Sequence, residues 1–97
     1  MSIPEKKIRA VQDILVEWNP LGPRAKSIHD LNEYHTEAID IICQLRIQAI
    51  RGFGPIQVVQ MVLNSAFDLN LSRSECKKPA RKIVAALEQS PISLLET

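Results

Sequence analysis

The sequence is poor in aromatic residues and carries almost no net charge. Phenylalanine, tryptophan and tyrosine make up 4% of the 97 residues, and 12 lysines and arginines against 11 acidic residues leave a formal charge of +1. So few aromatics argue against a stacking platform for single-stranded nucleic acid. The near-neutral total removes the simplest reason to expect the chain as a whole to bind nucleic acid.

Long apolar runs and paired cysteines are also missing. The longest apolar run, Ile83 to Leu87, is far shorter than the roughly 20 residues that a membrane-spanning helix needs. The N-terminus has no apolar stretch typical of a secretory signal. Cys43 and Cys76 are far apart and form no Cys-x-x-Cys pattern. We therefore expect a cytoplasmic protein with two reduced thiols and no membrane segment.

Apolar residues recur with a helical period in four segments, and no segment alternates with the period of a strand. The length suits a single domain, residues 1–97, with 1–3 and 92–97 as flexible or loosely docked ends. The sequence therefore predicts an all-α fold, a compact bundle of about four helices. The expected helices run from near Pro4 to Asn19, from Asp30–Asn32 to about Ile50, from Pro55 to about Leu69 and from Ser72 towards Pro91.

The second helix is expected to be the central one. Its isoleucines, leucine and alanines between Ala38 and Ile50 cover much more than one stripe, which indicates burial around most of its girth. Gly52 is a candidate left-handed cap at its end. The connection before it, residues 19–31, is long enough to be either an ordered loop or a functional one, and both interpretations stay open.

A capping box predicts the start of the fourth helix, because Ser72 is followed three residues later by Glu75. Pro79 lacks the N–H that would bond back to the preceding turn, so the helix either kinks there or restarts. The sequence leaves the choice between these two open.

No arrangement of residues indicates catalysis or a metal. The only histidines, His29 and His35, lie at the entry of the second helix, and Cys43 is two turns beyond His35, out of hydrogen-bond reach. The carboxylates around His35 lack a converging set of ligands. We therefore expect no enzyme activity, no cofactor and no metal site.

The near-neutral total hides two oppositely charged segments. An acidic edge is expected along the second helix, spaced by three, four and three residues: Asp30, Glu33, Glu37 and Asp40. A basic segment lies in the fourth helix: Arg73, Lys77, Lys78, Arg81 and Lys82. The two segments either pair within the fold, are solvated, or form partner sites, and the sequence does not decide between these.

Part of the chain resembles a known family. The run Glu17-Trp18-Asn19-Pro20-Leu21-Gly22, followed by Tyr34 among acidic residues, is similar to the Trp-Asp-Pro-Leu/Ile-Gly turn of the YugE-like small bacterial helical proteins, a family of unknown function. Cys76 and Ala80 match as well, whereas Asn19 replaces the commoner Asp and Pro79 departs from the pattern. The resemblance implies an all-α fold, no catalytic residues and an immunity-type role.

These observations together predict a non-enzymatic binding protein. The principal hypothesis is an immunity-type inhibitor that neutralises a cognate bacterial toxin, expected to be a basic nuclease, through the acidic edge. The alternative is a nucleic-acid-associated regulator that places the basic segment 73–82 on phosphates. The identity of the partner and the oligomeric state are left open.

Overall fold

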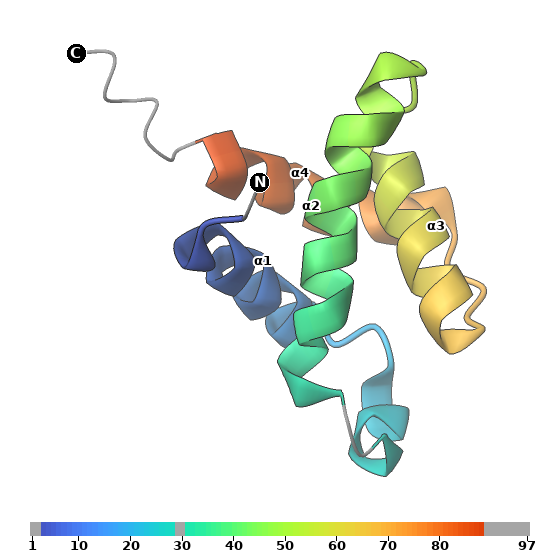
Figure 1. The fold of residues 1–97 in the computed structure, drawn as a ribbon. Helices are drawn as coiled ribbons and strands as arrows, with labels where there is room; N and C mark the ends of the chain where they lie inside the picture. The colour runs from blue at the N-terminus through green and yellow to red at the C-terminus, as the bar shows by residue number, and fades with distance from the viewer. Residues whose placement is uncertain (1–2, 29–30, 89–97) are drawn as a thin grey trace.

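The computed structural model describes residues 3–28 and 31–88, and every regular element in these residues is helical. This confirms the predicted all-α bundle (Figure 1). Within these described residues, no helix is long and apolar enough to cross a membrane. The elements are α1 (Glu5–Trp18), the 3-10 turns η1 (Gly22–Ser27) and η2 (Asn32–Tyr34), α2 (His35–Ile50), α3 (Pro55–Phe67) and α4 (Arg73–Glu88).

The helices surround one apolar core. The helices α1 and α3 each pack against both α2 and α4, and α2 crosses in front of α4 in Figure 1. Each helix contributes a stripe with helical spacing to the core, as the periodicity predicts. The completely buried side chains include Val11 and Leu15 of α1, Ile41 of α2, Leu63 of α3 and Ile83 of α4.

The second helix begins later than the capping residues indicate. We expected it to start at Asp30–Asn32, but α2 starts at His35 because Asn32, Glu33 and Tyr34 all have left-handed backbone angles, with φ of 46°, 56° and 62°. Such angles cost energy in non-glycine residues, so tertiary contacts must hold them. One such contact comes from Gln12 of α1, whose Nε2 donates a hydrogen bond to the carbonyl of Glu33 at 3.3 Å.

The helix α2 is buried over only part of its length. Its fully buried side chains, Ala38, Ile41 and Ile42, all lie in the first half of the helix. In the second half Ile47 is 49% exposed and Ile50 is 88% exposed. The prediction that α2 is buried around most of its circumference therefore holds only near the crossing with the other helices. Periodicity measures the apolar content of a face and cannot tell how far the neighbouring helices extend.

The end of α2 follows its predicted capping signal. The amide of Gly52, at φ 86°, donates to the carbonyl of Ala49, and the amide of Phe53 donates to the carbonyl of Gln48. This pair of bonds is a Schellman motif and confirms Gly52 as the cap of α2. The helix α4 then continues from Arg73 to Glu88 without restarting at Pro79.

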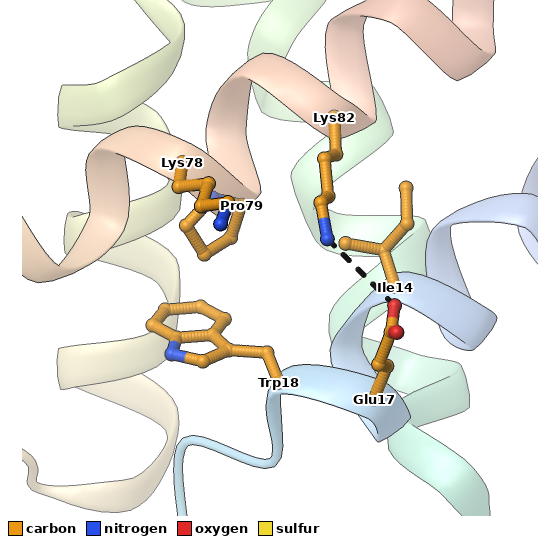
Figure 2. A pocket seen from close by; sticks show the side chains of 6 residues that line it. All are labelled: Ile14, Glu17, Trp18, Lys78, Pro79 and Lys82. Atoms are coloured by element: carbon orange, nitrogen blue, oxygen red, sulfur yellow. Dashed lines mark ion pairs between the residues drawn. The ribbon is translucent and has the colours of Figure 1, made fainter.

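The connection between α1 and α2 is an ordered segment built on two 3-10 turns. The buried Tyr34 hydroxyl accepts a hydrogen bond from the Leu21 amide at 3.4 Å and donates one to Asn19 Oδ1 at 2.8 Å. Trp18, at the end of α1, faces Pro79 of α4 (Figure 2). Residues 89–97, which include the predicted end at Pro91 and most of the predicted tail, lie outside the described residues.

Candidate functional site

The basic segment lies on a well-defined helix whose start is fixed by local hydrogen bonds. The Ser72 amide donates to Glu75 Oε1 at 2.8 Å, and the Glu75 amide donates to Ser72 Oγ at 3.1 Å. This reciprocal pair is the predicted capping box. It satisfies two backbone donors at the start of α4.

The helix α4 has one buried face and one exposed face. The buried face consists of Cys76, Pro79, Ala80 and Ile83, at the spacings that place residues on one side of a helix. The remaining half of the helix surface points to solvent and carries all five basic residues of the segment as exposed side chains. We call this surface the α4 basic face; it consists of Arg73, Lys77, Lys78, Arg81 and Lys82.

The α4 basic face borders a shallow pocket against the end of α1 (Figure 2). The half-buried indole of Trp18 faces the ring of Pro79, and Lys78 and Lys82 stand at the rim. The pocket has a volume of about 190 Å³, too small for more than a small group. Trp18 thus serves both as a wall of this pocket and as part of the packing between α1 and α4.

Few acidic groups neutralise the α4 basic face. Lys82 Nζ lies 3.8 Å from Glu17 Oε1, with both side chains largely exposed, so this ion pair is weak. Glu75 is the one acid within residues 73–82, and its carboxylate is engaged in the capping box. A helical face with four further exposed cations is therefore left to attract an anionic surface.

The acidic residues do not form one row along a helix. Glu33 lies in η2, before α2 begins, and its Oε1 is 3.6 Å from Arg9 Nη1. Glu37 and Asp40 share α2, where Glu37 is half-buried and Asp40 is exposed. Asp30 lies outside the described residues. The spacing argument assumed an unbroken helix from Asp30, and the left-handed turn at residues 32–34 removes that basis.

Asp40 lies beside a hollow between α2 and α3. The hollow has a volume of about 500 Å³ and is open along one side, with Gln44 and Gln48 on α2 and Met61 and Val62 on α3 among its walls. Of the apolar side chains named here, Met61 is 41% exposed and Val62 is buried. The acidic and basic segments do not pair in the described ion pairs, in which Glu33 contacts Arg9 and Lys82 contacts Glu17.

The cysteines form no disulfide in the described residues. Both cysteines are free, with Cys43 half-buried and Cys76 completely buried. Burial, assisted by the negative charge of Glu75, raises the pKa of Cys76 to about 11, so its thiol is protonated and inert at neutral pH. Within residues 3–28 and 31–88, no group of three or more histidine, cysteine or acidic side chains could hold a metal ion.

Sequence reasoning missed the polar residues that organise the α1–α2 connection. Gln12 and Asn19 hold η2 and Tyr34 in place through hydrogen bonds to Glu33 and to the Tyr34 hydroxyl. Gln12 sits between Val11 and Asp13 as an unremarkable polar residue, so no sequence signal marks its burial. The partner atoms are more than ten residues away, and only the fold brings them together.

Comparisons with known proteins identify no relative of this chain. No protein-family model, curated protein or solved structure matches the chain. The resemblance of the Trp18–Gly22 turn to the YugE-like family therefore stays a prediction.

Proposed function

We propose that this protein is a non-enzymatic binding protein whose main binding surface is the α4 basic face, and that its partner is the phosphate backbone of a nucleic acid. The observation that carries the proposal is the exposure of five cations on one side of a single helix, spread over residues 73–82. At a rise of about 1.5 Å per residue the segment is about 14 Å long, and its cations spread over about half of the helix circumference. A patch of this size can contact several phosphates of a nucleic-acid backbone.

The geometry favours the α4 basic face over the acidic edge as the main binding surface. Its five cations lie on one rigid element, whereas the described acids are divided between η2 and α2, and Glu33 has Arg9 beside it. Charge on a rigid, continuous face gives a larger local potential than the same charge dispersed. The near-neutral total does not oppose this, because the relevant quantity is the charge that faces the partner.

Binding of a labelled mixed-sequence DNA duplex and of an RNA of equal length, followed by fluorescence anisotropy in a salt series, tests the proposal. We expect the observed association constant to fall steeply as salt rises, since each neutralised phosphate releases counterions. The double substitution Lys78→Glu with Arg81→Glu reverses two exposed charges that make no described ion pair, and should abolish binding. Absence of binding to both nucleic acids at low salt overturns the proposal.

The matched control is the double substitution Lys6→Glu with Lys26→Glu. It makes the same change in net charge at exposed positions on α1 and η1. If it weakens binding as much as the α4 substitution does, the attraction belongs to the total charge and the assignment to α4 is wrong. Thermal unfolding of each variant shows whether the fold is intact.

The second candidate is the immunity-type inhibitor of a basic toxin. It is favoured by one observation, that Asp40 is exposed beside a hollow of mixed polarity that includes Met61. The test is co-purification of the intact chain with a nuclease whose activity it suppresses. Suppression should be lost on Glu33→Lys with Glu37→Lys, at nearly unchanged thermal stability. A partner that is suppressed equally by the variant would contradict the acidic-edge assignment.

A further inference from the structure

The exposed hydrophobic side chains of this protein are concentrated in one region. Five large apolar side chains are more than a third exposed in the described residues, and four of them belong to α2, the turn after it, or α3. The four are Ile47, Ile50, Phe53 and Met61. A gathering of exposed apolar groups on a small protein marks an interaction surface, because single scattered groups are the ordinary case.

The outer face of α2 also carries charges of opposite sign at its two ends. Asp40 and Arg51 are both exposed and lie 11 positions apart in the sequence, which is about three helical turns, so they point to the same side. Cys43, Gln44 and Ile47 lie between them on that side, away from the buried Ala38 and Ile41. The outer face thus has an acidic end, an uncharged middle and a basic end.

We propose that a second copy of this chain covers this face, with the two α2 helices packed antiparallel about a two-fold axis near residues 45–46. A two-fold interface requires a surface that is complementary to itself. A face with an acidic end and a basic end meets that requirement only when the second helix runs in the opposite direction. Asp40 of each copy then lies opposite the partner's Arg51, and Cys43 lies beside the partner's Ile47.

Helix dipoles and apolar burial also favour the antiparallel arrangement, in addition to the pairing of Asp40 with Arg51. Antiparallel helices place each helix N-terminus, with its partial positive charge, beside the partner's C-terminus. The apolar Ile47 and Cys43 would leave water together, and Ile50 would be covered in part by the first turns of the partner helix. These contributions are added twice, because every contact in a two-fold dimer occurs in two copies.

This interface does not compete with the α4 basic face. The helices α1 and α3 each pack against both α2 and α4, and α2 lies in front of α4 in Figure 1. Covering the outer side of α2 therefore leaves the α4 surface of both copies open. The dimer is consequently independent of the proposed function, and either one can fail without the other.

Sedimentation equilibrium of the intact chain over a concentration series up to millimolar tests the dimer. We expect a monomer–dimer equilibrium for the unchanged chain. Asp40→Arg and Arg51→Asp should each weaken dimerisation by about tenfold or more, since two attractive pairs become repulsive. The double substitution Asp40→Arg with Arg51→Asp should restore it, because the pairs are re-formed with reversed sign. The control Asp13→Arg, on α1, should leave the dimer unchanged.

Covalent trapping gives an independent measurement of the register. Mild oxidation with copper–phenanthroline in air should link Ile47→Cys chains into dimers through the partner's Cys43, because the proposed packing places positions 43 and 47 opposite each other. The matched control is Val16→Cys, at an apolar position of similar exposure on α1. A chain that stays monomeric up to millimolar concentration, a double substitution that fails to restore association, or equal cross-linking by both cysteine variants overturns the proposal.

Discussion

The hydroxyl of Tyr34 lies 2.8 Å from Asn19 Oδ1 and donates a hydrogen bond that joins the start of α2 to the end of α1. The same hydroxyl accepts the amide of Leu21 at 3.4 Å, and the Tyr34 ring meets Phe67 of α3 edge to face, with centroids 6.0 Å apart. Tyr34 is 2% exposed. One side chain therefore connects three helices and orders the long segment between α1 and α2.

Tyr34→Phe should destabilise the protein by about 1 to 3 kcal/mol. The substitution keeps the ring contact with Phe67 but leaves the amide of the buried Leu21 without its partner, and an unsatisfied buried donor carries a cost of that size. Urea unfolding measures the change. Asn19→Asp is the control, since it retains an acceptor oxygen towards Tyr34, and it should cost much less than Tyr34→Phe.

Pro79→Ala should stabilise the protein by about 1 to 2 kcal/mol. Alanine restores the backbone hydrogen bond to the carbonyl of Glu75, and proline in a helix interior costs about 3 kcal/mol relative to alanine. The substitution also removes the packing of the buried proline ring, which faces Trp18 across a pocket, and we expect this loss to be smaller than the backbone gain. Thermal unfolding decides the sign; a lower melting temperature would mean that the ring contact dominates.

Stability should fall as the pH rises from about 9 to about 11. The pKa of Cys76 is raised from 9.0 to about 11 by burial and by Glu75. A raised pKa in the folded state contributes stability that is complete below the unfolded value and is lost on approaching the folded value. Two pH units correspond to about 2 to 3 kcal/mol. Burial also raises the pKa of Tyr34, which adds to the loss in the same direction.

Cys76→Ala isolates this contribution. The free energy of unfolding of the variant, measured by urea titration at a series of pH values, should decline less steeply above pH 9 than that of the unchanged chain. Equal slopes would assign the alkaline loss to Tyr34 and other groups, and would contradict a role for the Cys76 thiol.

Gly52→Ala should destabilise the protein by about 1 kcal/mol, whereas Gly54→Ala should have little effect. Gly52 has φ 86°, an angle that alanine adopts at a cost, while Gly54 has φ −87°. Neither added methyl group would meet another atom within 4 Å, so the two substitutions differ in backbone angle and not in crowding. Chemical denaturation of both variants, compared under one condition, measures the difference.

Local signals in the sequence predicted the four helices, although not the start of α2. The apolar period, the Ser72–Glu75 capping box and the glycine after α2 each depend on residues within a few positions of one another, and the structure confirms all three. The same reasoning identified all five cations of the α4 basic face. It succeeded there because one helix carries the whole set, so spacing alone determines which side they share.

The tertiary structure decided everything that depends on distant residues. Whether α2 begins at Asp30 or at His35 depends on Gln12 and Tyr34, whose hydrogen-bond partners lie far along the chain. Whether Ile47 and Ile50 are buried depends on how far the neighbouring helices reach, which no pattern within α2 records. Residue types therefore determined the helices and their charged faces, while packing selected the faces that meet solvent, since burial is a property of the whole assembly of helices.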